Sequence, residues 1–157
     1  MNIKVITIGK TNKSFLMEGE SEYLKRLKRY APIEKIELPD IKGAKKMSQS
    51  EIKQKEGALI LSKLIATDIV ILLDDKGKDY SSIQFSKWLQ NKMNTSIKSL
   101  VFIVGGAYGF SAELYARSQE KLSISKMTFS HQMIRMIFFE QLYRAFSILN
   151  NEPYHHE

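Results

Sequence analysis

The chain contains 157 residues, of which 43% are hydrophobic and 26% charged, a composition that argues against disorder, a collagen helix or a disulfide-stabilised miniprotein. The absence of cysteine excludes disulfides, thiolate zinc sites and cysteine nucleophiles, while the formal net charge of +7 suits a polyanionic partner without requiring one. No apolar stretch approaches the roughly 18 residues that a membrane span needs, so we expect one cytoplasmic domain over residues 1–157 with no membrane partner.

Strand-like and helix-like patterns alternate through the first half of the chain. The β-branched run at residues 3–8 predicts a strand buried on both faces. Apolar residues at helical spacing follow over residues 15–30, and a short alternating strand at 36–38 precedes a lysine-rich loop. Ser48, with Glu51 three residues later, predicts the start of a second helix.

The alternation continues in the second half. We expect strands at residues 70–73, 100–104 and 122–124, a helix beginning at Ser81 or Ser82, a short helix capped by Ser111, and a long helix running from Ser130 to Leu149. Such an order of elements predicts an α/β fold in which helices cover a parallel sheet.

Three loops leave the carboxyl ends of these strands, where open parallel sheets bind ligands. We place them at residues 74–78, 105–110 and 123–130. The second loop has three glycines and no Lys or Arg, which disfavours phosphate and suits a ligand such as S-adenosylmethionine. A tight turn without a ligand is the alternative. The third loop mixes apolar and small polar residues that either wrap a flat heterocycle or join the core.

The last predicted helix is apolar on two sides, so both sides are buried in a core or against a partner subunit, and we expect a dimer interface. Arg135, Glu140 and Arg144 interrupt these faces, either as buried pairs or as groups that face a phosphate or base edge. The first apolar stripe comprises Met133, Ile134, Ile137, Phe138, Leu142, Ala145, Phe146 and Leu149, and the second comprises Met136, Phe139 and Tyr143.

Two further features suggest contact with RNA. Four cations fall within residues 25–29 and five lysines within residues 42–55, which predicts an RNA-binding rim, with a solvated helix face as the alternative. In the tail, Tyr154 is able to stack on a base. The adjacent His155 and His156 cannot share one strand face, so we predict no metal site.

Several segments taken together resemble the RlmH family, the SPOUT-class methyltransferases of large-subunit rRNA pseudouridine. They are residues 104–110 (VGGAYGF), 122–135 (LSISKMTFSHQMIR), 140–145 (EQLYRA) and 153–155 (PYH). The resemblance covers the whole chain. It implies a SPOUT fold with a trefoil knot near the carboxyl end, an exception to the rule that chains avoid knots. It also implies a homodimer that methylates N3 of a pseudouridine in the helix 69 loop of 23S rRNA on the assembled ribosome.

The resemblance further implies that S-adenosylmethionine sits in the knot. Carried over by position, its contacts are Leu73, Gly105, Ile124, Ser125, Lys126, Met127, Thr128 and Phe129.

The same resemblance suggests a catalytic set. We expect Arg135 and Arg144 to orient the base or a phosphate, and His131, Tyr154 and His155 to position the base or remove its N3 proton.

The chain departs from the family pattern at Ser130, where relatives often have proline, and at His156, where a basic residue usually follows Tyr-His. A non-catalytic RNA-binding module with the same fold is the alternative function.

Overall fold

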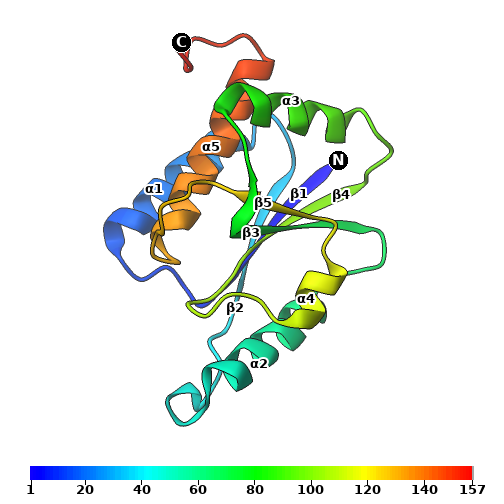
Figure 1. Ribbon diagram of the computed structural model, residues 1–157. Helices are drawn as coiled ribbons and strands as arrows, with labels where there is room; N and C mark the ends of the chain where they lie inside the picture. The colour runs from blue at the N-terminus through cyan, green and yellow to red at the C-terminus, as the bar shows by residue number, and fades with distance from the viewer. Residues whose placement is uncertain (157) are drawn as a thin grey trace.

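Five parallel strands form the centre of the molecule, in the spatial order β2-β1-β4-β3-β5 (Figure 1). The structure is a computed structural model and describes residues 1–156. The strands are β1 (Asn2–Ile8), β2 (Ile33–Leu38), β3 (Asp68–Asp79), β4 (Ser99–Val104) and β5 (Glu120–Ser123). The helices are α1 (Ser14–Leu27), α2 (Gln49–Leu61), α3 (Ser82–Met93), α4 (Ala112–Arg117) and α5 (Met133–Leu149), with a 3-10 turn η1 at Ala44–Lys46.

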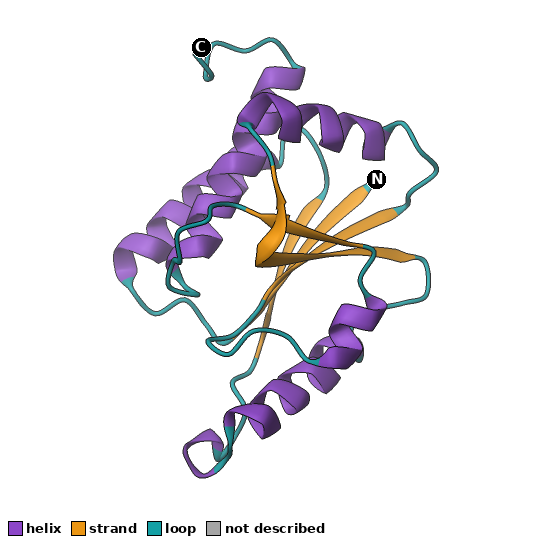
Figure 2. Ribbon diagram, viewed as in Figure 1, coloured by secondary structure: helices purple, strands orange, loops and turns teal. Residues whose placement is uncertain are grey.

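Helices cover both faces of the sheet, as the alternation of patterns predicted (Figure 2). Side chains alternate between the faces along each strand. In β4, Leu100 and Phe102 pack with α1, α3 and α5, whereas Val101 and Ile103 pack with α2 and α4. All six residues of β4 are buried, which explains why this strand reads as a continuous apolar run. None of the helices within residues 1–156 is long and apolar enough to cross a membrane.

The expectation that the third strand ends at Asp74 is wrong. Leu122 of β5 pairs first with Leu73 and then with Lys78, so residues 74–77 bulge outward and β3 resumes beyond them. Gly77 makes this possible, because a Cβ atom there would lie 2.7 Å from backbone atoms of Leu122. Residues 74–77 therefore lie outside the register between β3 and β5.

The predicted helix starts are mostly confirmed. Ser81 and Gln84 form a complete capping box at α3, and the Ser48 and Ser111 hydroxyls each accept a backbone N–H in the first turn of α2 and α4. Helix α5 begins at Met133 rather than directly after Ser130. The Ser130 hydroxyl nevertheless accepts the Met133 N–H at 3.1 Å, so Ser130 caps the turn that leads into the helix.

The two apolar stripes of α5 are covered only in part within the chain, since Met133, Ile134, Ile137 and Leu149 of the first stripe are half-buried. Phe138 packs on Phe102 of the sheet, with 4.7 Å between ring centroids. On the other side Tyr143 lies 6.1 Å from Tyr23 of α1, and Phe139 is fully buried. The second stripe is therefore covered largely by α1. The dimer interface expected on α5 stays a prediction.

Candidate active site

A pocket of about 730 Å³ opens at the bulge of β3 and at the carboxyl ends of β4 and β5. All three loops named from the sequence contribute to its wall, as expected for an open parallel sheet. Lys126 lies outside the lining. The other residues carried over as cofactor contacts line the pocket: Leu73, Gly105, Ile124, Ser125, Met127, Thr128 and Phe129.

The glycine loop after β4 is a compact turn. The Gly109 N–H donates to the Gly106 carbonyl at 3.3 Å, and Gly109 has a φ of 82° in the left-handed region. A Cβ at Gly106 would lie 2.6 Å from a carboxylate oxygen of Glu56, and one at Gly105 would lie 3.0 Å from the Phe110 ring. Glycine is thus needed at residue 105 for packing against Phe110, and not because of a positive φ.

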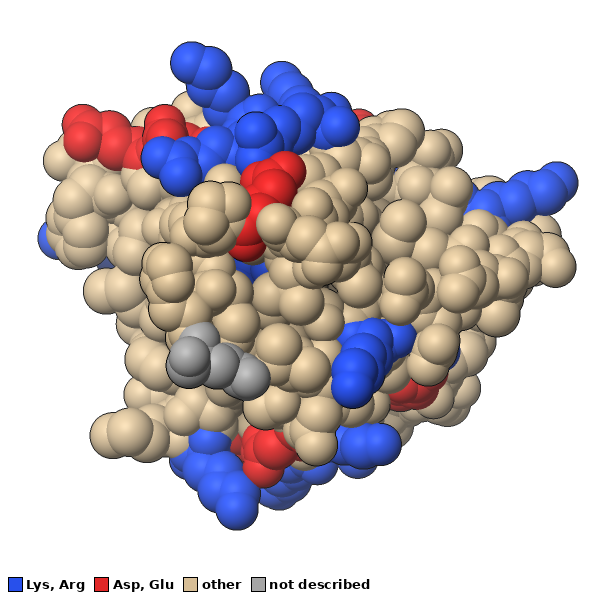
Figure 3. All heavy atoms as spheres, turned by 90° about the horizontal axis from the view of Figure 1, so that it is seen from above, with Lys and Arg blue, Asp and Glu red and all other residues tan. Residues whose placement is uncertain are grey.

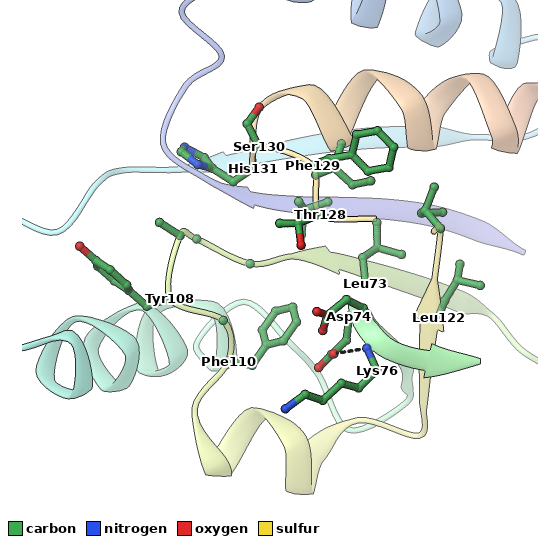
Figure 4. A pocket seen from close by; sticks show the side chains of 18 of the residues that line it. Leu73, Asp74, Lys76, Tyr108, Phe110, Leu122, Thr128, Phe129, Ser130 and His131 are labelled. Atoms are coloured by element: carbon green, nitrogen blue, oxygen red, sulfur yellow. Dashed lines mark hydrogen bonds between the residues drawn. The ribbon is translucent and has the colours of Figure 1, made fainter. Parts of the chain in front are cut away.

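The loop between β5 and α5 is held by its own small polar side chains. The Ser123 hydroxyl donates to the Ser125 carbonyl at 3.0 Å, and the Ser125 hydroxyl accepts the Met127 N–H at 3.0 Å. This conformation places Thr128 and Phe129 along one side of the pocket, opposite Phe110 (Figure 4). Met127 is 76% exposed at the mouth. The loop therefore offers both apolar surface and backbone groups to a flat ligand.

Asp74 supplies a fixed negative charge to the pocket, a role that the sequence analysis missed. Its carboxylate accepts the Lys76 N–H at 2.8 Å and the Tyr115 hydroxyl at 2.5 Å. Burial opposes ionisation, but these hydrogen bonds prevail and lower the pKa of Asp74. Burial and the bond to Asp74 raise the pKa of Tyr115 to about 12. The sequence offered one signal for this role, because Asp74 stands directly after a predicted buried strand.

His131 lies at the rim of the same pocket, just ahead of α5 (Figure 4). Partial burial and the nearby charge of Arg135 lower the pKa of its imidazole, against an opposing effect of Asp40. The imidazole is therefore mostly neutral at pH 7 and is able to accept a proton.

Arg135 has a different environment from the one we expected. It is fully buried, and its guanidinium donates to the carbonyls of Ile8 at 2.5 Å and Gly9 at 2.9 Å. It also donates to the Thr11 hydroxyl at 3.2 Å and to the His131 carbonyl at 3.1 Å. Arg135 thus ties α5 to the end of β1 and has no surface from which to orient a base.

The other three expected catalytic residues gather near the far end of α5. Glu140 accepts hydrogen bonds from Arg144 at 2.5 Å and from the Tyr154 hydroxyl at 3.1 Å. Arg144 lies 4.7 Å from the centre of the Tyr154 ring and 3.3 Å from the imidazole of His155. We call Glu140, Arg144, Tyr154 and His155 the tail cluster. The tail packs on α5 and is not a frayed end.

The tail cluster and the pocket are separate in one chain. Ile134 lines the pocket, and Arg144 follows on the same helix about 15 Å further along its axis, at a rise of 1.5 Å per residue. Residues 150–156 accordingly follow the end of α5 that is remote from the loop before the helix (Figure 1). One chain therefore brings His131 to the pocket but leaves Arg144, Tyr154 and His155 at the opposite end of α5.

Comparison with known proteins agrees with this architecture. A family model described as "Predicted SPOUT methyltransferase" matches residues 1–155. This chain belongs to the SPOUT methyltransferase family. Proteins named "Ribosomal RNA large subunit methyltransferase H" from Parabacteroides distasonis and Flavobacterium johnsoniae are 55% and 56% identical to it, each over 157 residues that cover all of both chains. These relatives confirm the resemblance drawn from the sequence.

A solved structure supports the SPOUT fold. A probable methylase family protein from Haemophilus influenzae Rd KW20 aligns with 99% of this chain and 71% of its own, at a TM-score of 0.55 and 12% sequence identity. At that identity the likeness concerns the fold alone. It agrees with the parallel sheet flanked by helices, while the trefoil knot stays a prediction from the family.

The pocket of this SPOUT chain fits S-adenosylmethionine by its own chemistry. Leu73, Ile124 and Phe129 offer apolar surface for an adenine ring, and the glycine loop exposes backbone groups. The ionised Asp74 complements a ligand that carries a sulfonium and an ammonium charge. Residues 1–156 contain no cluster of three or more His, Cys, Asp or Glu side chains that could hold a metal ion.

Basic side chains lie near the pocket and also near the tail cluster. At the tail end, Lys25, Arg26 and Arg29 of the basic run border a shallow hollow of about 340 Å³ with Tyr143. On the face seen from that end, Lys and Arg gather at two opposite edges and are interspersed with Asp and Glu (Figure 3). At the other end Lys53 lines the main pocket. Within one chain, the basic run at residues 25–29 therefore lies near the tail cluster, and Lys53 of the second run lies at the pocket. The two runs do not flank a single site.

Proposed function

We propose that this protein uses S-adenosylmethionine to methylate N3 of a pseudouridine in the helix 69 loop of 23S rRNA on the assembled ribosome, as a cytoplasmic homodimer. The observation that carries the proposal is the pocket at the strand ends, which combines an ionised aspartate with a glycine loop that lacks Lys and Arg. The names of the full-length relatives support an rRNA substrate.

When bound, S-adenosylmethionine supplies an electrophilic methyl group on a sulfonium sulfur. The N3 atom of the base must lose its proton as it attacks this carbon, and a side chain near the pocket has to receive that proton. We assign this role to His131, because its lowered pKa leaves the imidazole neutral at pH 7. Tyr154 is a poor acceptor, since burial raises the pKa of its hydroxyl and keeps it protonated.

The tail cluster acts on the pocket of the partner subunit in this proposal. Helix α5, which joins the pocket to the tail cluster, packs on Tyr23 of α1 and on Phe102 of the sheet, so one chain cannot fold its tail cluster onto its own pocket without losing that packing. A second copy with two-fold symmetry brings each tail cluster to the other chain's pocket. The two basic runs then flank one composite site and follow the RNA backbone.

Methyl transfer from labelled S-adenosylmethionine to ribosomes tests the proposal. Incorporation at N3 of pseudouridine, identified by mass spectrometry of digested rRNA, is the expected result. Ribosomes lacking the pseudouridine are the matched control and should accept no label. Binding to ribosomes without incorporation would instead support the alternative of a non-catalytic RNA-binding module.

A further inference from the structure

A buried network of hydrogen bonds joins four elements of the fold and ends at the backbone of His131. At its centre the Thr11 hydroxyl donates to Glu20 Oε1 at 2.7 Å and accepts from Arg135 Nη1 at 3.2 Å. The same hydroxyl accepts from Lys35 Nζ at 3.4 Å, and Lys35 also pairs with the other oxygen of Glu20. These four residues, the Thr11 network, come from the segment after β1, from α1, from β2 and from α5.

The bonds of this network leave its central groups no alternative partners. A hydroxyl has one proton to donate and two lone pairs that accept, and Thr11 uses all three. Thr11, Glu20 and Arg135 are each at most 5% exposed, so bulk water does not reach a group that loses its partner. The Arg135 guanidinium is therefore held by Thr11 on one side and by the carbonyls of Ile8 and Gly9 on the other.

Two links connect the segment after β1 to the rim of the pocket. Through the first, Arg135 Nε donates to the His131 carbonyl at 3.1 Å and fixes the backbone of that residue. The second lies at the surface, where the Gln132 side chain accepts the Asn12 N–H at 3.1 Å. With the backbone held, only two side-chain torsions of His131 remain to direct its imidazole into the pocket.

The cofactor loop ahead of His131 is held in a different way. The Ser123 and Ser125 hydroxyls bond to groups of that same loop, at the Ser125 carbonyl and the Met127 N–H. A change at Thr11 is therefore expected to displace His131 while residues 124–129 keep their conformation. Proton transfer and cofactor binding can thus be tested separately.

We propose that Thr11 and Asn12 are positioning residues for methyl transfer: through Arg135 and Gln132 they hold the backbone of His131, so that its imidazole at the pocket rim reaches the N3 proton of the target base. This proposal rests on the proposed function. As the proton moves to the imidazole, which becomes a cation, the electron pair left on N3 forms the bond to the methyl carbon. The bond from that carbon to sulfur breaks, and the sulfonium becomes a neutral thioether.

The position of His131 is measurable in the protein alone by an NMR pH titration of the full chain, with His131→Gln to assign its signal. Thr11→Val replaces the hydroxyl with a methyl group of similar size, and Thr11→Ser, which keeps a hydroxyl, is the matched control. Both variants retain the charges that act on His131, which are Arg135 from α5 and Asp40 from the segment after β2.

Burial and the charge of Arg135 lower the pKa of His131 in the unmodified protein. A displaced imidazole loses part of both effects, so we expect His131 to titrate at higher pH in Thr11→Val and at its original pH in Thr11→Ser. This readout needs neither cofactor nor ribosomes.

Methyl transfer to ribosomes is the second measurement. We expect Thr11→Val to lower kcat by about ten- to a hundredfold and to move the acid limb of its pH profile to higher pH, while the affinity for S-adenosylmethionine, measured by calorimetry, stays unchanged. Thr11→Ser should keep most of kcat. Ser86→Ala removes another buried hydroxyl, which bonds within α3, and should alter neither kcat nor the titration of His131.

Three outcomes would overturn the positioning role: an unchanged His131 titration in folded Thr11→Val, an unchanged kcat in that variant, or a loss of kcat that Ser86→Ala shares. Should Thr11→Val fail to fold, Gln132→Ala breaks the link at the surface and is expected to shift the His131 titration in the same direction by less. No shift in Gln132→Ala would then overturn the proposal. If the unmodified protein transfers no methyl group at all, the proposed function fails, while the titration still decides whether the segment after β1 positions His131.

Discussion

Combining two inactive variants in one solution tests whether the site is shared between subunits. The first variant, Gly105→Val, disables the pocket. A Cβ at residue 105 already lies 3.0 Å from the Phe110 ring, so the two further methyl groups of valine must displace a ring that lines the pocket. The second variant lacks residues 153–157 and so loses Tyr154 and His155, while Glu152 keeps its bonds to Arg29 and Tyr30.

The expected activity of the mixture follows from symmetry. When equal amounts of two subunits exchange freely, about half of the dimers contain one of each. If the tail acts on the partner's pocket, each mixed dimer has one intact site of two, so the mixture should reach about a quarter of the unmodified rate. If the tail acts on its own pocket, both sites of each mixed dimer are broken and activity stays near zero.

Methyl transfer to ribosomes is measured before and after subunit exchange, with each variant alone as the control. Both variants must first show cooperative melting and a dimer by sedimentation. The truncated chain is expected to melt somewhat lower, because the Tyr154 ring packs 4.6 Å from Tyr143. No recovery on mixing, from variants that exchange, would refute the shared site. A truncated chain with the full rate would remove the tail from catalysis.

Three further predictions concern single features. Arg135→Met should lower the free energy of unfolding, measured in urea at fixed protein concentration, by about 1–3 kcal/mol for each buried carbonyl that loses its donor; a variant of full stability that has lost activity would show a direct catalytic role instead. Because burial and the charge of Arg135 lower the pKa of His131, kcat should rise with pH through one ionisation on the acid side of an ordinary imidazole and then level, and His131→Gln should remove this step; a step that persists in the variant belongs to another group. Neutralising the four cations within residues 25–29 should weaken ribosome binding and reduce its salt slope by about 3, with cofactor affinity unchanged; an unaltered slope would make this run a solvated face.

Much of the fold was predictable because its signals are local. The β-branched run at residues 3–8 and the apolar run at 100–104 predicted two of the three inner strands, and Ser81 was one of two residues predicted to begin a helix. The bulge at residues 74–77 was not predictable, because it exists only through pairing with Leu122, far along the chain. The local sequence of residues 74–77 predicts a loop, whereas pairing with β5 makes the chain continue as strand β3 beyond them.

The candidate site, like the fold, was predictable from the sequence only in part. The strand-end rule and the motifs located the pocket, since both depend on residues close in sequence. The environment of Arg135 was hidden, because the carbonyls that it satisfies belong to Ile8 and Gly9 at the other end of the chain. The position of Asp74 directly after a buried strand was visible in the sequence, but its hydrogen bond with Tyr115 of α4 was not. Long-range hydrogen bonds decided both cases.

Helix α5 carries the pocket wall near its start and the tail cluster near its end, and its packing on Phe102 and Tyr23 leaves it no freedom to slide. The helix therefore keeps the pocket wall and the tail cluster at a fixed separation and in a fixed relative orientation. Inserting one residue between Ile137 and Glu140 would advance the tail cluster by only about 1.5 Å but rotate it by about 100°, turning Arg144 away from its present direction. The number of residues between the two halves is thus a tighter constraint on this enzyme than the identity of most side chains that separate them.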